Sequence, residues 1–390
     1  MIKKRISETR FSKIFKEFLE NEKTGGIILV AVTIISLILA NTSWHDTYKS
    51  IWEFPVANHN LEHWINDGLM TVFFLLIGLE IKREIYKGEL SNIKNASLPV
   101  FGALGGMIVP ALLYTAFNIG KVTQSGTGIP MATDIAFSIG ILSLLGNKVP
   151  ASLKIFLTAL AIIDDLGAII VIALFYTSDL SVLNLLIALG IFGILLLFNF
   201  FKLNKIFIYL IGGTIMWYFM LHSGVHATIT GVLLAFAIPF IDGSKKSPSS
   251  ILEHALQKPV PFIILPIFAM ANTCIVIEPN WFASLTHDNS IGIMTGLILG
   301  KPIGIFLFAF ASVALGWSAL PKDLKWTNII GAGIIAGIGF TMSIFITLLA
   351  FDDPHLVAGS KIAILLASLT AGIIGYIYLK LNLKNKKISH

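Results

Sequence analysis

The feature that most constrains this chain is a series of long apolar segments that begins near residue 24 and continues to residue 383. Each segment offers roughly 20 mostly apolar residues, the length that an α-helix needs to cross a hydrocarbon core about 30 Å thick. Only 13% of the 390 residues are charged, against about 25% in ordinary soluble domains. The sequence therefore predicts an all-α polytopic membrane protein and excludes a soluble fold.

We expect about twelve membrane-spanning helices in a single domain, 24–383. Their approximate ranges are 24–41, 62–81, 96–118, 129–146, 151–176, 181–201, 205–222, 224–241, 258–277, 290–315, 327–350 and 357–380. Before this domain, residues 1–23 predict a cytoplasmic amphipathic segment that lies at the membrane interface. After it, residues 384–390 predict a basic cytoplasmic tail.

Basic residues indicate the orientation of the chain. Most of the 28 lysines and arginines fall in alternate loops and at the two ends, which is the positive-inside pattern and predicts that both termini are cytoplasmic. The net charge of +6 is then a topology signal and not a nucleic-acid-binding surface. The single cysteine, Cys274, excludes an internal disulfide and is expected to be a small core residue.

Two of the expected spans are poorly suited to form continuous helices. The range 129–146 follows G-T-G and continues I-P-M-A-T-D, and the range 327–350 carries four glycines before Thr341. Glycine and proline both weaken a helix interior. Unwound backbone at membrane depth is tolerated only where protein or a water-filled cavity covers it, so these two segments are candidates for lining an ion path.

A faint internal similarity links the same two segments. Residues 133–142 align with residues 340–349, which suggests that 96–176 and 290–380 are inverted repeats. The frequent use of glycine in membrane helices explains the alignment equally well.

The strongest candidates for chemistry are Asp164 and Asp165, within an otherwise apolar span. A charged side chain at the bilayer centre costs at least about 2.5 kcal/mol, and a structural ion pair explains one aspartate better than two. Burial and mutual repulsion favour proton binding, and the same oxygens suit a small hard cation. Thr133 and main-chain carbonyls at the break in span four would add neutral oxygen ligands. A site that binds H⁺ or a cation, but not both together, predicts antiport.

Two further charged residues lie in apolar surroundings. Lys301 has apolar residues on both sides, which favours a buried lysine paired with a carboxylate over one that snorkels to the interface. Asp134 lies at the break in span four. Where two broken helices cross, facing helix ends concentrate partial charge of one sign, which an acidic and a basic side chain could offset.

Several other polar residues have a structural and a functional interpretation. A cluster at the expected inner ends of spans consists of Glu80, Lys82, Arg83, Glu84, Glu253 and His254. Taken alone it is expected to be a solvated rim, and the alternative is a proton-sensing gate. His222 and His226 are four residues apart but lack the glutamate of a zinc peptidase motif, so we expect a structural or gating role and no metal site. Asp67 is expected to cap the second span, and the alternative is a place in the ion path.

Together these residues resemble the NhaA family of bacterial sodium/proton antiporters. The matching stretches are I-N-D-G-L-M-T-V-F-F-L-L-I-G-L-E-I-K-R-E, A-T-D-I-A-F-S-I-G, A-L-A-I-I-D-D-L-G-A-I-I, L-H-S-G-V-H-A-T-I-T-G, G-K-P-I-G and G-I-G-F-T-M-S-I-F-I. The resemblance implies twelve spans, inverted repeats with broken helices that cross at spans four and eleven, and no cofactor. It also implies a pH-regulated, electrogenic exchange of two protons for one Na⁺ or Li⁺ across the inner membrane.

The same resemblance implies roles for individual residues. Asp164 and Asp165 would bind the transported ion and the protons, with Thr133 nearby. Lys301 would pair with Asp164, and Asp134 would balance charge at the crossing. The pH response would involve Glu80, Arg83, Glu84, His226, Glu253 and His254.

The sequence departs from the family at two places. Gln257 stands where the family pattern has a histidine, so the pH profile is expected to differ. The family's dimer contact is a β-hairpin between the first two spans, and no hairpin is evident between Trp44 and Asn60. A homodimer is therefore expected from the resemblance alone.

Two alternatives to antiport come from other functional classes. A sodium-coupled symporter of an organic solute would need a larger pocket framed by polar or aromatic residues. An intramembrane aspartyl protease normally takes its two aspartates from different helices, whereas Asp164 and Asp165 are adjacent. We therefore expect a transporter and not an enzyme, with the lipid bilayer, Na⁺ or Li⁺ and H⁺ as its partners.

Overall fold

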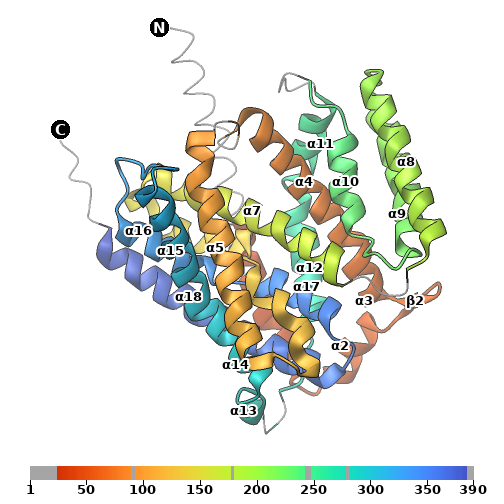
Figure 1. The fold of residues 1–390 in the computed structure, drawn as a ribbon. Helices are drawn as coiled ribbons and strands as arrows, with labels where there is room; N and C mark the ends of the chain where they lie inside the picture. The colour runs from red at the N-terminus through yellow and green to blue at the C-terminus, as the bar shows by residue number, and fades with distance from the viewer. Residues whose placement is uncertain are drawn as a thin grey trace, which may run out of the picture.

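The structure is a computed structural model of the chain (Figure 1). It describes residues 24–88, 91, 93–176, 180–241, 247–277, 279 and 281–383. The predicted amphipathic segment, 1–23, and the predicted basic tail, 384–390, lie outside the described residues.

Helices lie within each range for which the sequence predicts a membrane span. In chain order they are Thr24–Ala40; α3 (Leu61–Trp64), η1 (Ile65–Leu69) and α4 (Met70–Lys87); α5 (Ile93–Asn118); η3 (Val122–Met131) and α6 (Ile135–Leu144); α7 (Ala151–Phe175); α8 (Val182–Phe200); α9 (Ile206–Leu221); α10 (Ile229–Ala237); α11 (Pro248–Leu256), η5 (Val260–Ile264) and α12 (Leu265–Asn272); α14 (Asp288–Thr295), η6 (Gly296–Gly300) and α15 (Lys301–Ala314); α16 (Trp326–Ala336) and α17 (Phe340–Ala350); and α18 (Pro354–Asn382). The shorter elements between them are α2 (His45–Trp52), β1 (Pro55–Val56), β2 (His59–Asn60), η4 (Gly146–Lys148) and α13 (Trp281–Ser284).

Length and composition identify most of these helices as membrane spans. Within the described residues, seven are long and apolar enough to cross a bilayer, and up to ten if each of three bent pairs is one span. The helices in the other two predicted spans are shorter: α9 has 16 residues and α10 has 9 residues. The predicted all-α, multi-pass membrane architecture is confirmed.

Both predicted breaks are present in the structure. η3 is a 3₁₀ helix that contains Pro130, and the chain is extended at Ala132 and Asp134 before α6 begins. The axes of η3 and α6 differ by 42°, and those of α16 and α17 differ by 48° across the residues Gly337–Gly339. The backbone groups freed at each break need partners within the protein, because lipid offers none.

Close contact between α5 and α15 fixes the start of α15. A Cβ atom on Gly105 would overlap the carbonyl oxygen of Gly304, and one on Gly304 would overlap the carbonyl oxygen of Gly105. Small residues let two membrane helices approach at this range. The π-helical turn η6 directly precedes Lys301, the first residue of α15. Helix packing therefore holds Lys301 at a set depth and orientation.

α8 and α9 form a separate part of the fold at one edge of the molecule, on the right of Figure 1. They pack against α4 and α10 through a second apolar cluster, which includes Tyr209 and Met216. Only 11% of the most apolar stretch of α8 is buried within the protein. The remaining apolar face of α8 is suited to contact lipid.

A short β-hairpin corrects one expectation from the sequence. β1 pairs with β2 in antiparallel register, Pro55 with Asn60 and Val56 with His59. Ala57 has a φ of 55°, in the left-handed region that tight hairpin turns use. Strands of two residues are too short to show an alternating pattern, so the hairpin was not evident between Trp44 and Asn60.

Candidate ion-binding site

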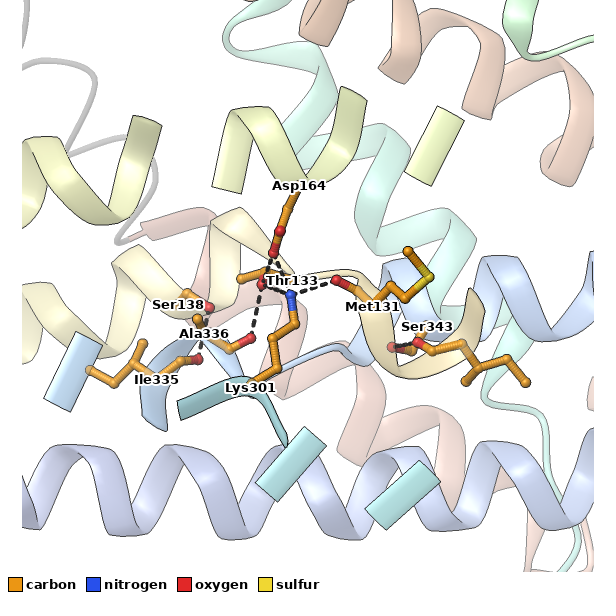
Figure 2. A network of polar contacts seen from close by, with 9 residues as sticks. Met131, Thr133, Ser138, Asp164, Lys301, Ile335, Ala336 and Ser343 are labelled. Carbon is orange, nitrogen blue, oxygen red and sulfur yellow. Dashed lines mark hydrogen bonds and ion pairs between the residues drawn. The ribbon is translucent and has the colours of Figure 1, made fainter. Parts of the chain in front are cut away.

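Asp164 and Asp165 lie in the middle of α7 with no exposure to solvent. Figure 2 shows Asp164 pointing from α7 towards Thr133 and Lys301. Asp164 Oδ2 accepts a hydrogen bond from the Thr133 hydroxyl at 2.8 Å and forms an ion pair with Lys301. Among the described residues, Asp164 Oδ1 and both carboxylate oxygens of Asp165 have no hydrogen-bond partner. Buried carboxylate oxygens without partners are available for a proton or a cation.

Lys301 is fully buried and has three oxygen neighbours. Besides the Asp164 carboxylate, its ammonium donates to the Met131 carbonyl at 2.5 Å and to the Thr133 hydroxyl at 2.8 Å (Figure 2). These partners satisfy the three donors of a lysine ammonium. The predicted pairing with a carboxylate is observed, and the snorkelling alternative is excluded.

The two broken helices cross so that like ends meet. α6 and α17 both begin at the crossing, and Asp134 lies between their N-termini. It accepts hydrogen bonds from the backbone N–H of Phe137 at 2.9 Å, the N–H of Thr341 at 3.1 Å and the Thr341 hydroxyl at 2.5 Å. A carboxylate is favoured at such ends because helix N-termini carry partial positive charge.

The C-terminal ends of η3 and α16 meet on the other side of the crossing. The Met131 carbonyl, the last of η3, accepts from Lys301. The Ala336 carbonyl, the last of α16, lies 2.9 Å from the Thr133 hydroxyl, whose single hydrogen it shares with Asp164 Oδ2. Partial negative charge at helix C-termini favours a cation there. The helix N-termini at the crossing thus contact the Asp134 carboxylate, and the Met131 carbonyl at the C-terminal end of η3 contacts the Lys301 ammonium.

Hydroxyl groups of each broken helix satisfy carbonyls of the other. Ser138 on α6 donates to the Ile335 carbonyl of α16 at 3.2 Å, and Ser343 on α17 donates to the Ile129 carbonyl of η3 at 2.7 Å (Figure 2). These serines and Thr341 were not among the sequence candidates, because serine and threonine are common in helices. Only the crossing shows which freed carbonyls they meet.

A narrow cavity of about 30 Å³ leads to the crossing. Its lining includes Glu80 on α4, Asp134, Leu265 on α12 and Thr341. A space of this size holds about one water molecule. Most of the lining is apolar, and Glu80 and Asp134 are the two charged residues that it contains.

The expectation of a solvated rim is wrong for three members of the cluster around Arg83. Glu80, Lys82 and Glu253 are only 5%, 4% and 5% exposed. Arg83 forms an ion pair with Glu253 and another with Glu84 at 3.0 Å, and Glu80 lies within electrostatic reach of it. The apolar segments that surround these residues remove them from water, so the charges pair with one another.

Lys82 has a structural role that sequence reasoning missed. Its ammonium donates to the carbonyls of Ala235 at 3.3 Å and Phe236 at 2.9 Å, and also to that of Ile238. These are among the last carbonyls of α10, which lack partners within the helix. Lys82 thus caps α10, and no local pattern in the sequence connects two positions so far apart.

The predicted pH-response residues do not all lie together. His254 is exposed and its ring contacts the Gln257 amide at 3.2 Å, next to the Arg83 cluster. His226 instead follows α9 and has Asp67 as an electrostatic neighbour. Asp67 and Arg83 are 16 residues apart on one helix, about 24 Å along its axis. His226 therefore lies at the opposite end of α4 from Arg83.

Asp67 does not cap the second span. The N-cap of α3 is Asn60, whose side chain accepts from the His63 N–H at 2.8 Å. Asp67 lies within η1 and pairs with the His63 ring at 3.2 Å. Among the described residues, no group of three histidine, cysteine, aspartate or glutamate side chains is arranged to hold a metal ion.

Comparison with known proteins identifies relatives over nearly the whole chain. Residues 16–379 match the family model described as Na⁺/H⁺ antiporter 1. The chain is 62% identical over 378 residues to the Na⁺/H⁺ antiporter NhaA 1 of Flavobacterium johnsoniae, covering 97% of this chain and 99% of that relative. It is 60% identical over 381 residues to the Na⁺/H⁺ antiporter NhaA of Flavobacterium psychrophilum, covering 98% and 99%.

A solved structure has a similar fold. The sodium proton antiporter MjNhaP1 from Methanocaldococcus jannaschii aligns with a TM-score of 0.52 and 14% identity, over 96% of this chain and 99% of that one. At this identity the likeness concerns the fold alone. The family match and the high identity to NhaA proteins over almost their full length show that the chain belongs to the Na⁺/H⁺ antiporter 1 family.

Proposed function

We propose that the protein is a secondary active transporter that exchanges Na⁺ or Li⁺ for H⁺ across the bacterial inner membrane. The observation that carries this proposal is the pair of fully buried aspartates on α7 beside a buried lysine, at the crossing of two broken helices. The relatives named Na⁺/H⁺ antiporters support it.

Competition for the same oxygens explains the exchange. Without Na⁺ the site holds two protons, either one on each aspartate or one on Asp165 and one on Lys301, whose ammonium then pairs with Asp164. A buried negative charge is costly without a proton or a counter-charge. Na⁺ replaces the protons by binding the carboxylates of Asp164 and Asp165, with the Thr133 hydroxyl and main-chain oxygens as neutral ligands. Since one set of oxygens serves both ions, the two ions cross in opposite directions.

Lys301 and Asp134 have supporting roles in this proposal. Lys301 neutralises Asp164 while the site lacks Na⁺, and the cation takes over that neutralisation when it binds. Asp134 balances the helix ends on the other side of the crossing through its bonds to Phe137 and Thr341. Replacement of two protons by one Na⁺ leaves the site with one positive charge less, and this difference is the net charge that each cycle moves.

The pH response is proposed to start at the cluster of Glu80, Arg83, Glu84, Glu253 and His254, in which Glu80 and Glu253 are buried and His254 is exposed. The cavity lined by both Glu80 and Asp134 supports this, because it brings one residue of the cluster and one of the crossing to the same space. His226, at the other end of α4, would respond to pH separately.

The proposal also includes the orientation of the chain in the membrane and its assembly as a homodimer. Both termini lie in the cytoplasm, with the single membrane domain 24–383 between them and inverted repeats at about 96–176 and 290–380. The β-hairpin at Pro55–Asn60 is the place where two copies would meet in a homodimer.

The test is a Na⁺-induced change of internal pH in proteoliposomes, at several pH values around neutrality. The parent protein is expected to move protons when Na⁺ or Li⁺ alone is added, and Asp164→Asn and Asp165→Asn are expected to abolish the response. Asp288→Asn is the matched control, because Asp288 is half exposed and pairs with Lys121 away from the crossing. A parent without a response, or a requirement for an organic solute, would overturn the proposal.

A further inference from the structure

Tyr176 links α7, the helix that carries Asp164 and Asp165, to η3, the first half of the broken span four. It follows directly after α7, and its N–H caps that helix by donating to the Ile172 carbonyl at 3.1 Å. Its phenol hydroxyl donates to the Ser125 carbonyl at 2.6 Å and accepts from the Gly128 N–H at 3.3 Å. Both partners are main-chain groups of η3.

The two bonds act on the segment that supplies the ion site. Gly128 lies three residues before Met131, about 6 Å along a 3₁₀ helix with its rise of about 2 Å per residue. Met131 offers its carbonyl to Lys301, and Thr133, which contacts Asp164, lies two residues further along the chain (Figure 2). A shift of η3 against α7 would therefore move these ligands relative to Asp164.

A side chain at position 128 would collide with the Tyr176 hydroxyl. A Cβ atom at this position would lie 2.8 Å from the Tyr176 hydroxyl oxygen, whereas its next neighbours, on Ile346 and Val171, would be at an ordinary 3.4 Å. The absence of a side chain at Gly128 lets the phenol reach the backbone.

We propose that Tyr176 is a positioning residue for cation binding: its hydroxyl holds η3 against α7 and so sets the distance between Asp164 and the ligands that follow η3. The proposal rests on the antiport function proposed above. It predicts that loss of the hydroxyl weakens cation binding more than it slows turnover.

The first measurement compares Tyr176→Phe with the parent in proteoliposomes. Phenylalanine keeps the ring and removes both hydrogen bonds, and the apparent KM for Na⁺ is expected to rise about three- to tenfold with a maximal rate within about twofold of the parent. Tyr209→Phe is the matched control: Tyr209 is fully buried on α9, and its hydroxyl donates to the Leu203 carbonyl at 2.9 Å. The control should leave the KM unchanged.

A second pair of variants separates positioning from general damage. Gly128→Ala should raise the KM as Tyr176→Phe does, because the new methyl group displaces the hydroxyl. The double variant should be no worse than either single one, since the phenylalanine ring has no hydroxyl for the methyl group to meet. An unchanged KM in Tyr176→Phe, an equal rise in Tyr209→Phe, or additive losses in the double variant would overturn the proposal. An inactive parent would instead refute the antiport function and this proposal with it.

Discussion

A single buried lysine joins three parts of the site. Lys301 on α15 contacts Asp164 on α7 and the chain on both sides of the break after η3, through Met131 and Thr133. A buried ion pair adds little net stability because both charges lose water. Removal of one partner is costly, since the other charge stays buried. The pair is thus better understood as a functional element than as a stabilising one.

Lys301→Gln is expected to destabilise the purified protein by about 3 kcal/mol or more, because it leaves Asp164 buried without its counter-charge. Asp164→Asn combined with Lys301→Gln should recover part of this loss, as neither charge then remains. Thermal unfolding in detergent measures both effects.

Lys121→Gln is the comparison for that measurement. The Lys121–Asp288 pair is about half exposed, so its loss should cost about 0 to 1 kcal/mol. Equal melting temperatures for Lys301→Gln and Lys121→Gln would contradict the interpretation of the buried pair.

At the scale of elements, the broken helices depend on caps that come from each other. Asp134 is the N-cap of α6 and also binds the first turn of α17. A continuous helix needs no such partners at membrane depth, but a broken one leaves free N–H and C=O groups that must be satisfied. One carboxylate thus serves two helix starts at the crossing.

Asp134→Ala is expected to lower the melting temperature more than Asp134→Asn does. Alanine removes both caps, each worth about 0.5 to 2 kcal/mol, whereas asparagine keeps one acceptor oxygen. Asp353→Ala is the control, because Asp353 caps α18 at an exposed position through the His355 N–H. The interpretation would fail if Asp134→Ala were no less stable than Asp353→Ala.

At the scale of the whole molecule, the fold surrounds a buried charged site with packed apolar helices. Asp164 and Asp165 are fully buried near the middle of α7, which is long and apolar enough to cross a bilayer. An ion that reaches or leaves a site in the middle of a membrane-spanning helix crosses part of the membrane potential. Exchange that moves net charge must then respond to that potential.

Exchange of two protons inward for one Na⁺ outward moves one positive charge inward per cycle. An inside-negative potential of about 100 mV then supplies about 2.3 kcal/mol per cycle. Na⁺ efflux from proteoliposomes, with the potential set by a K⁺ gradient and valinomycin, should be faster at negative potential than at zero. Equal rates at both potentials would indicate electroneutral exchange.

The sequence by itself determined which residues are exceptional. Asp164, Asp165 and Lys301 stand out because charges are costly in apolar spans, and the glycines and Pro130 mark the two breaks because they weaken helices. These are local properties, since each depends on a residue and its neighbours in the chain. The all-helical fold and its two breaks could therefore be predicted.

The tertiary structure alone decided what these residues meet. The burial of Glu80 and Lys82, the cap that Lys82 provides for α10, the hairpin at Pro55–Asn60 and the bonds of Tyr176 all depend on contacts between distant segments or on very short elements. Hydropathy records how well a segment suits lipid, but not which helix lies beside it. Partners are set by packing, and packing is a property of the folded chain.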